Sequence, residues 1–271
     1  MAKEVAKETN ADAKLHPVAA FITNSINIVM TGKGGVGKSY VAQTLSQYFL
    51  HYKRIATSTS DSDPVNASTF RIKALNPEFI KIMENNTILQ SNFDQVIESF
   101  VANEDITFVL DTGASTYVPL MQYFYDNDLV DFFSSLGRPV FLHTIIMAGQ
   151  ELPDTLNGFK SLCEMVKGTN VKVVAWINEL KGTPIVDVKG VSTPLIETPV
   201  LLKILLIASV GFVVIEDRKS DAFTADLKAL TSKNLTLEEA KQSSEFNIMQ
   251  KTRLNKVYKA IYDQLDEIYT A

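Results

Sequence analysis

Cysteine is nearly absent from this sequence. The chain of 271 residues contains one cysteine, Cys163, so an internal disulfide and a cysteine cage for zinc or an iron–sulfur cluster are both excluded. A chain without disulfides is typical of a reducing compartment, and we expect a cytoplasmic protein. Cys163 lies in a segment of helical period, where a small buried hydrophobe is its simplest role.

Positive charge is not in excess. Lysine and arginine number 26 against 31 aspartates and glutamates, which gives a net charge of -5. This balance is not that of a protein coated with positive charge for nucleic acid, although a local basic patch is compatible with it. DNA binding is therefore neither indicated nor excluded by charge.

Long hydrophobic runs are also missing. The most apolar stretch, residues 200–215, is shorter than the ~18–20 residues of a typical membrane span, and Lys203 and Gly211 interrupt it. It predicts a buried helix that leads into a buried strand, and no integral membrane segment. Residues 1–24 are charged and rich in alanine, without the apolar core of a signal peptide, and predict a flexible N-terminal extension. Residues 25–271 are expected to form one domain.

Short apolar runs alternate with longer segments of helical period through most of the chain. Helical period is present in residues 37–52, 92–102, 117–136 and 152–166. The alternation predicts an α/β fold, with a single doubly wound, mostly parallel sheet and helices on both faces. Several runs are apolar at every position, as in central strands that are covered on both sides. The expected strands are Ser25–Met30, Arg54–Thr59, Ile106–Leu110, Pro139–Thr144, Val171–Ile177 and Val210–Ile215.

Two regions depart from the alternation. Residues 181–199 contain three prolines and two glycines, and predict an inserted loop or small hairpin. Residues 235–271 predict C-terminal helices with one apolar stripe. We expect this stripe to pack on the sheet rather than on a membrane, because the polar face of the helix mixes both charges. The stripe consists of Phe246, Met249, Leu254, Val257, Ile261, Leu265 and Ile268.

A glycine-rich loop follows the first expected strand. Residues 32–39 fit the pattern G-x-x-x-x-G-K-S and stand between that strand and a helix that begins near Lys38. In such a loop the backbone N–H groups and the helix N-terminus surround a phosphate. Lys38 would reach the β- and γ-phosphates of a nucleotide, and the Ser39 hydroxyl would bind Mg²⁺. A second lysine, Lys33, stands at the front of the loop, where a phosphate cradle does not require it.

Acidic residues follow two other expected strands. Asp111 ends the third strand, where it would hold a Mg²⁺-bound water. Asp61 and Asp63 follow the second strand, and in extended backbone two such positions point the same way. One carboxylate would assist Mg²⁺ and the other would orient the attacking water. An Asx turn that caps the next helix is the structural alternative.

Together these motifs resemble the deviant Walker A ATPases of the ParA/MinD group. The segments KGGVGKS, DSDP and LDTGA carry that resemblance. A narrower similarity, to the TraL-type conjugal transfer ATPases, rests on further segments between residues 32 and 178 and on NIMQKTRL near the C-terminus. The segments between residues 32 and 178 are GKGGVGKS, DSDPVNAS, LDTGASTYVPL, HTIIMAGQELPDTLNGF and AWIN.

The resemblance implies a role for each matched residue. Lys33 matches the signature lysine, which in relatives reaches the nucleotide of the facing subunit in an ATP-sandwich dimer. Asp63 matches the water-positioning aspartate, Asp61 a metal-side acid and Asp111 the Walker B aspartate. Asn178 matches an asparagine that hydrogen-bonds adenine.

The resemblance also implies ligands. The chain is expected to bind ATP or ADP with Mg²⁺, with Lys33, Lys38 and Asp63 in catalysis. The metal ligands are expected from Ser39, Asp61 and Asp111. Residues 215–220 depart from the proline-bearing base loop of the family, which leaves their base contacts open. Nucleotide contacts are expected from Gly32, Lys33, Gly34, Gly35, Val36, Gly37, Lys38, Ser39, Tyr40 and Asn178.

The function implied is an ATP-dependent dimerisation switch with slow hydrolysis, located in the bacterial cytoplasm. ATP would join two copies of the chain, and the partner would be a protein of the conjugative transfer machinery or the relaxosome. Three alternatives stay open: a ParA-like partition protein that binds DNA, a MinD-like membrane-associated ATPase, and a metabolic enzyme similar to dethiobiotin synthetase. Salt-sensitive DNA affinity, vesicle binding and substrate-dependent turnover would distinguish them.

Overall fold

The computed structural model describes residues 22–85, 87–199, 201 and 209–270. The extension expected over 1–24 lies outside the described residues up to position 21, as does most of the helix expected at the start of 200–215.

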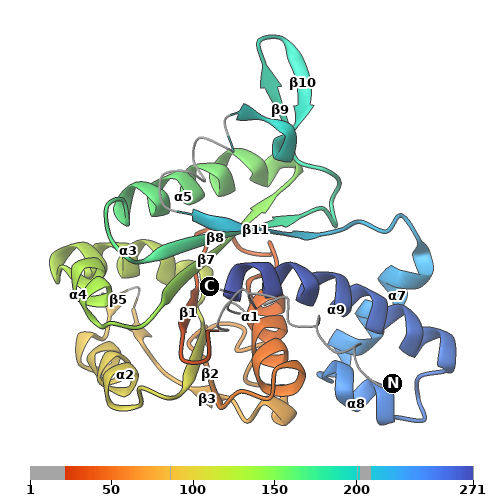
Figure 1. Ribbon diagram of the computed structural model, residues 1–271, viewed down its shortest axis with the longest axis horizontal. Helices are drawn as coiled ribbons and strands as arrows, with labels where there is room; N and C mark the ends of the chain where they lie inside the picture. Colours follow the sequence, from red (N-terminus) through yellow and green to blue (C-terminus); the bar gives the residue numbers. More distant parts are fainter. Residues whose placement is uncertain (1–21, 86, 200, 202–208, 271) are drawn as a thin grey trace, which may run out of the picture.

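A seven-stranded parallel sheet forms the centre of the molecule (Figure 1). Its strand order is β11-β8-β7-β1-β6-β2-β3, so the chain winds to one side of β1 and then to the other. Every expected strand is present, and the doubly wound α/β fold is confirmed. The additional edge strand, β3, has only two residues, both exposed, and carries no apolar pattern. The strands are β1 (Ile26–Val29), β2 (Thr57–Asp61), β3 (Glu78–Phe79), β6 (Thr107–Asp111), β7 (Val140–Met147), β8 (Lys172–Asn178) and β11 (Ser209–Ile215).

Helices cover both faces of the sheet and create two apolar cores. On one face α2, α3, α4 and α5 pack on alternate side chains of the strands. On the other face α1, α7, α8 and α9 pack on the intervening side chains. Strands buried on both sides explain why several of the sequence runs are apolar throughout. The helices are α1 (Lys38–Gln47, continued by a π-helical turn, Tyr48–Tyr52), α2 (Gln90–Ala102), α3 (Tyr117–Asp126), α4 (Leu129–Ser135), α5 (Leu152–Met165), α7 (Asp221–Ser232), α8 (Leu237–Gln242) and α9 (Ile248–Tyr269).

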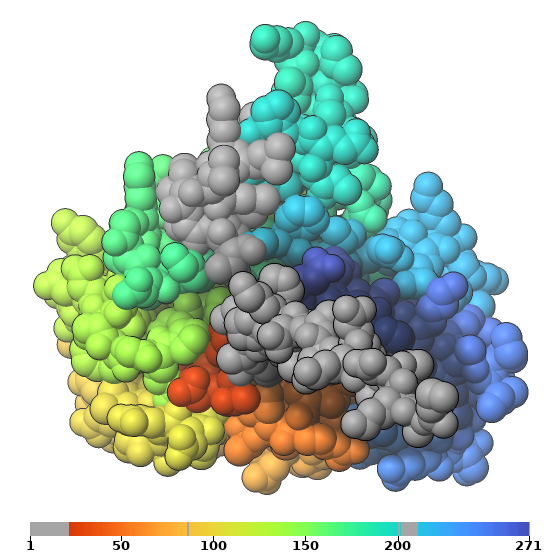
Figure 2. All heavy atoms as spheres, viewed as in Figure 1, coloured from red at the N-terminus to blue at the C-terminus, as the bar shows by residue number. Residues whose placement is uncertain are grey.

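Two small hairpins interrupt this plan. One, β4 (Met83–Glu84) with β5 (Thr87–Ile88), precedes α2. The other, β9 (Ile185–Val188) with β10 (Val191–Pro194), falls within residues 181–199 and projects from the body of the molecule (Figure 2).

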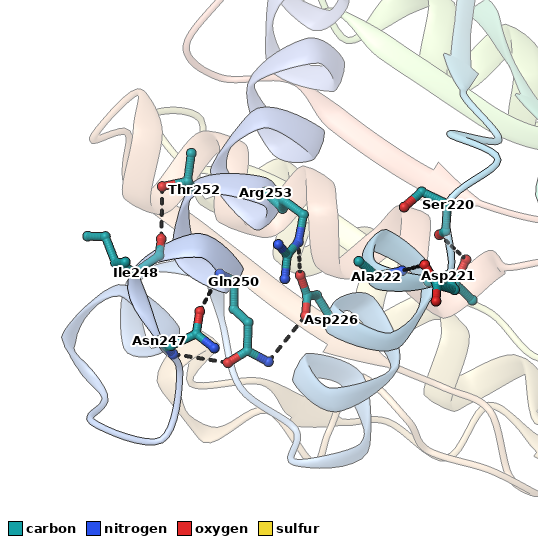
Figure 3. A network of polar contacts seen from close by, with 10 residues as sticks. Ser220, Asp221, Ala222, Asp226, Asn247, Ile248, Gln250, Thr252 and Arg253 are labelled. Carbon is teal, nitrogen blue, oxygen red and sulfur yellow. Dashed lines mark hydrogen bonds and ion pairs between the residues drawn. The ribbon is translucent and has the colours of Figure 1, made fainter.

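The C-terminal helix α9 lies across the face formed by α1 and β11 (Figure 1). Its expected stripe is buried, except that Ile268 is partly buried and Met249 is 57% exposed, so the expectation for Met249 was wrong. Polar contacts, rather than apolar packing, hold the N-terminal part of α9. The Asp226 carboxylate of α7 accepts hydrogen bonds from Arg253 Nε over 2.6 Å and from Gln250 Nε2 over 3.2 Å (Figure 3).

One arginine closes the amino end of the sheet. Arg138 is buried, and its guanidinium donates hydrogen bonds to four backbone carbonyls and, within the part of the chain that the structure describes, to no carboxylate. The Cζ atom of Arg138 also lies 5.6 Å from the centre of the Phe108 ring. Since guanidinium presents five donors in a fixed fork, it can join several chain segments at once. The carbonyls belong to Asn24, Phe100, Asn103 and Ile106.

A polar cluster is buried within the sheet and under α9. His143 accepts a hydrogen bond at Nδ1 from Trp176 Nε1 over 3.0 Å. Its Nε2 lies 3.2 Å from both Asn27 Oδ1 and the Tyr269 hydroxyl. An acceptor at Nδ1 requires the proton of a neutral imidazole to be on Nε2. Burial lowers the pKa of His143 to about 3, so the ring is neutral at physiological pH.

Candidate nucleotide-binding site

The glycine-rich loop lies where the winding of the sheet reverses. It joins the carboxyl end of β1 to the N-terminus of α1, and β1 is flanked by β6 and β7. Gly37 is the N-cap of α1 and has φ of +104°, a left-handed conformation that favours glycine. A Cβ at Gly34 or Gly35 would meet no atom within 4 Å, so the backbone of the loop faces open space. A crevice at the reversal point is where open α/β sheets bind ligands.

An open hollow of about 330 Å³ adjoins this loop. Ligand sites typically enclose ~300–1,000 Å³. Six residues expected to contact nucleotide or metal are not part of the lining of the hollow: Gly32, Lys33, Val36, Asp61, Asp111 and Asn178. The hollow is lined by Gly34, Gly35, Gly37, Lys38, Ser39, Tyr40, Asp63, Asn66, Ser68 and Ala114.

Lys38 points into the loop. It is buried, and Nζ donates a hydrogen bond over 3.0 Å to the backbone carbonyl of Lys33. Burial lowers the pKa of Lys38, and the charges of Asp111 and Asp63 partly oppose that shift. A desolvated ammonium without a bonded carboxylate is costly in the free protein and suited to a phosphate.

Lys33 points out of the same loop. Its Nζ forms an ion pair with Oδ2 of Asp154, at the start of α5, over 2.9 Å. This hydrogen bond and the charge of Asp154 raise the pKa of Lys33. The side chains are 40% and 64% exposed, so the pair lies at the surface, where ion pairs contribute little to stability. The two lysines of the loop therefore have opposite orientations.

Asp111 ends β6 below the loop and is fully buried. Oδ2 accepts a hydrogen bond from the Thr69 hydroxyl over 2.7 Å, whereas Oδ1 has no hydrogen-bond partner among the described residues. Burial raises the pKa of Asp111 to about 7. The charge of Asp61 also raises it, whereas the hydroxyls of Thr69 and Ser39 lower it. An orphaned buried carboxylate oxygen beside the Ser39 hydroxyl fits a hard cation, so Ser39 and Asp111 are suited to hold Mg²⁺.

Asp61 lies level with Asp111 on the neighbouring strand and is also buried. Its Oδ1 accepts a hydrogen bond from the backbone N–H of Asp63 over 2.9 Å. Its Oδ2 accepts from the N–H groups of Thr69 and Phe70 over 2.8 and 2.9 Å. Burial raises the pKa of Asp61, and these three bonds oppose the rise. Asp61 thus closes the loop 62–70 on itself, and its expected metal role stays a prediction.

Asp63 borders the hollow, with its carboxylate near the backbone of Gly113. Oδ1 accepts hydrogen bonds from the N–H groups of Val65 and Asn66 over 2.9 and 3.2 Å. This is the Asx-turn geometry considered for the segment. A Cβ at Gly113 would lie 3.2 Å from the Asp63 carboxylate, so the loop after Asp111 approaches closely. The carboxylates of Asp61 and Asp63 bind different parts of the loop 62–70: Asp61 accepts from Asp63 and Thr69, and Asp63 accepts from Val65.

Asn178 links the loop to β8. Its Nδ2 donates a hydrogen bond to the carbonyl of Val36 over 2.9 Å, and its Oδ1 accepts from the N–H of Leu180 over 3.0 Å. A Cβ at Gly37 would lie 3.1 Å from Nδ2. In this structure the amide supports the phosphate loop, and its expected contact with adenine stays a prediction.

Three residues of the site carry no sequence signal that would have identified them. Thr69 bonds Asp111 through its hydroxyl and Asp61 through its N–H. Asp154 pairs with Lys33 from 121 positions away. The ring of Tyr117 packs on Gly32, where a Cβ would lie 2.9 Å from it. Each contact depends on how distant segments meet, which spacing along the chain does not encode.

Neither a cluster of metal-binding side chains nor a membrane-spanning helix is found among the described residues. Within the described residues, no three or more His, Cys, Asp or Glu side chains gather as an ion site. Mg²⁺ in nucleotide sites usually takes only one or two carboxylates, with phosphates and water as its other ligands. Among the helices that the structure describes, none combines the length and the apolar character needed to cross a bilayer.

The loop, its reversal point and the buried carboxylate at the end of β6 define a P-loop nucleotide-binding protein, and Lys33 places it in the deviant Walker A class of ParA and MinD. No protein-family model matches the chain. Two proteins named TraL from Escherichia coli are each 32% identical, and each match covers 89% of this chain and 97% of the relative. The chain belongs to the TraL family.

Solved structures of similar fold include MinD from Aquifex aeolicus, with TM-score 0.43 and 12% identity over 89% of this chain and 96% of that one. A ParA family ATPase from Chlorobium tepidum has TM-score 0.48 and 12% identity over 89% of this chain and 97% of that one.

Proposed function

We propose that this protein is an ATP-dependent dimerisation switch with slow ATP hydrolysis, and that it serves conjugative DNA transfer. The observation that carries the proposal is the opposite orientation of the two lysines of the phosphate loop. Lys38 lies inside the loop, and Lys33 lies at the surface in an exposed ion pair. One lysine suffices for the nucleotide of its own subunit, and the other is free to serve a neighbour.

Each residue of the site has a separate role in the proposed hydrolysis. Lys38 leaves the Lys33 carbonyl and binds the β- and γ-phosphates. Their negative charge stabilises the buried ammonium, which has lost its contact with water. Ser39 and Asp111 hold Mg²⁺, which when bound neutralises charge on the phosphate oxygens. Asp63, at the edge of the hollow, orients the attacking water once the Asx turn rearranges.

Lys33 acts across the dimer. Its ion pair with Asp154 is exposed, so exchange for a phosphate of the facing subunit requires little energy. The dimer then lasts as long as ATP does, and hydrolysis reopens it. A switch of this kind works through the populations of two states, so slow turnover suits it.

The conjugative role rests on membership of the TraL family, together with the similarity to conjugal transfer ATPases. The dimer would recruit or organise a protein of the transfer machinery or the relaxosome.

Size exclusion with light scattering tests the proposal. Wild type, Asp63→Ala and Lys33→Ala are compared with ATP and Mg²⁺, and nucleotide binding is measured in parallel with a fluorescent ATP analogue. We expect a dimer for wild type, a longer-lived dimer for Asp63→Ala, and a monomer that still binds nucleotide for Lys33→Ala. Lys160→Ala, at an exposed lysine of α5, is the control and should dimerise as wild type does. Monomers in all samples, despite bound ATP, would contradict the proposal.

A further inference from the structure

The layer formed by α2, α3 and α4 has an outer surface with exposed apolar side chains. Val118 and Tyr125, on α3, are 72% and 79% exposed, and Phe132 on α4 and Val101 on α2 are also exposed. Single exposed hydrophobes are ordinary, but here four large ones lie on three neighbouring helices.

The inner sides of these helices pack against one another, so the three helices form one layer. The ring centres of Phe93 and Tyr123 are 5.1 Å apart, which joins α2 to α3. Phe124 and Phe133 are 5.8 Å apart, which joins α3 to α4. In Figure 2 these helices form the yellow and yellow-green flank of the molecule.

Charge on this flank has one sign. Residues 82–137 contain no lysine, arginine or histidine and nine aspartates and glutamates. At the overall frequency of lysine and arginine in the chain, about five would be expected in a stretch of this length. Eight of the nine acids are exposed, the exception being Asp111. Only Glu84 has an ion-pair partner, Lys81, among the described residues.

Basic groups on adjoining elements do not neutralise this flank. Arg138 is buried and donates its hydrogen bonds to backbone carbonyls, and its charge interacts only with those of Glu104 and Asp105 among the described acids of this stretch. On α5, which contacts α3 through the Tyr117 hydroxyl and the Gly158 carbonyl, Lys160 is exposed and forms no ion pair with these acids among the described residues. Lys167, just after the end of α5, is paired with Glu164. The acidic charges around the apolar side chains are thus available to a partner.

We propose that this surface, defined by Glu98, Val118, Tyr125, Asp126, Asp131 and Phe132, docks a basic amphipathic segment of a partner protein. Charge complementarity selects this occupant: lysine or arginine on the segment meets the acids, and its apolar side chains meet Tyr125 and Val118. DNA and anionic membranes carry the same sign as the surface and are repelled. A second copy that used this same surface would be repelled too.

The surface is joined to the nucleotide site. The helix α3 begins after the loop 112–116, which follows Asp111, and the Tyr117 ring packs against Gly32 at the front of the phosphate loop. If the chain is the ATP switch proposed above, a segment docked on α3 senses nucleotide through this contact. The docking itself does not depend on that function.

A peptide titration tests the docking. The probes are a fluorescent 18-residue peptide of leucine and lysine at helical spacing, its counterpart with glutamate in place of lysine, a DNA duplex, and phosphatidylglycerol vesicles. Binding is followed by anisotropy, or by sedimentation for vesicles, in ~0.15 M salt without nucleotide. We expect the lysine peptide alone to bind.

Two double variants locate the binding. E98K/D131K reverses two charges on the surface, and E197K/E267K makes the same change in net charge at exposed positions elsewhere. We expect the first to weaken lysine-peptide binding about tenfold and the second less than about twofold. Tyr125→Ser should also weaken it. Thermal unfolding verifies that each variant is folded.

Equal weakening by both double variants would overturn the proposal, because bulk charge would then explain the affinity. Failure of the lysine peptide to bind would also overturn it, as would a Tyr125→Ser variant that binds the peptide as wild type does. A third contrary result would be binding of the duplex or the vesicles that changes in E98K/D131K but not in E197K/E267K. Because nucleotide is absent, the proposed ATP switch can fail without affecting this result, and the reverse also holds.

Discussion

The ammonium group of Lys33 and the carboxylate of Asp154 lie 2.9 Å apart and join the front of the phosphate loop to the first turn of α5. The pair keeps Lys33 within its own subunit. Since both groups are well exposed, the pair restrains the lysine only weakly. It therefore competes with any acceptor that a second subunit presents.

Removal of that competitor should favour the dimer. We expect Asp154→Asn to lower the protein concentration at which half the chains dimerise in ATP and Mg²⁺, by about two- to fivefold. The measurement is light scattering over a protein dilution series. Glu164→Gln, which is also on α5, removes the ion-pair partner of Lys167 and should leave the midpoint unchanged. An unchanged or raised midpoint for Asp154→Asn would show that the pair does not oppose dimerisation.

The buried ammonium of Lys38 should reduce stability while it enables function. We expect Lys38→Met to raise the free energy of unfolding of the nucleotide-free protein by about 1 kcal/mol, because a desolvated charge is replaced by an apolar side chain of similar length. Affinity for ATP should fall about 100-fold. Urea unfolding and a fluorescent-nucleotide titration measure the two effects.

Lys160→Met is the matched control for this change. Its ammonium is exposed on α5, so we expect less than about 0.5 kcal/mol change in stability and normal nucleotide binding. A Lys38→Met variant that is less stable than wild type would show that the bond to the Lys33 carbonyl outweighs the desolvation of the charge.

Two buried groups should give stability opposite dependences on pH. The pKa of His143 falls from 6.5 to about 3 on folding, so between these values the unfolded chain binds more protons and stability declines as pH falls. The pKa of Asp111 rises from 3.8 to about 7, so the folded chain binds more protons and stability increases as pH falls. Each group contributes up to about 1.4 kcal/mol per pH unit.

Between about pH 4 and 6.5 the two effects therefore oppose each other in the wild type. We expect Asp111→Asn to remove one, so that its free energy of unfolding, measured in urea, declines more steeply than that of wild type as the pH is lowered. Asp126→Asn, at an exposed carboxylate, is the control and should follow the wild-type slope. Identical slopes for Asp111→Asn and wild type would mean that Asp111 is ionised throughout.

The sequence predicts the framework of the fold because its signals are local. Apolar runs mark most of the six expected strands, and the phosphate loop follows from glycines at fixed spacing. The strand β3 escapes prediction because two exposed residues carry no pattern. The expectation for Met249 failed because helical period does not register that Asp226, on another helix, holds the first turn of α9 by polar bonds.

The candidate site is predicted less completely. Lys38, Ser39 and Asp63 are brought together at one hollow, as their motifs indicate. The hydrogen-bond partners of Asp111 and Lys33 were not predicted. Thr69 meets Asp111, and Asp154 meets Lys33, only after distant segments of the chain pack together. Local motifs identify the chemical groups, and tertiary contacts determine their charge and direction.

The carbonyl cluster around Arg138 has a practical consequence. These four bonds join Arg138 to Asn24 and to residues 100–106, at the end of the sheet remote from the phosphate loop, and all four acceptors are backbone carbonyls. That end of the sheet can therefore serve as a fixed point for distance measurements. A spectroscopic label attached there, paired with one on the loop 62–70, would report the movement of that loop alone as nucleotide binds and leaves.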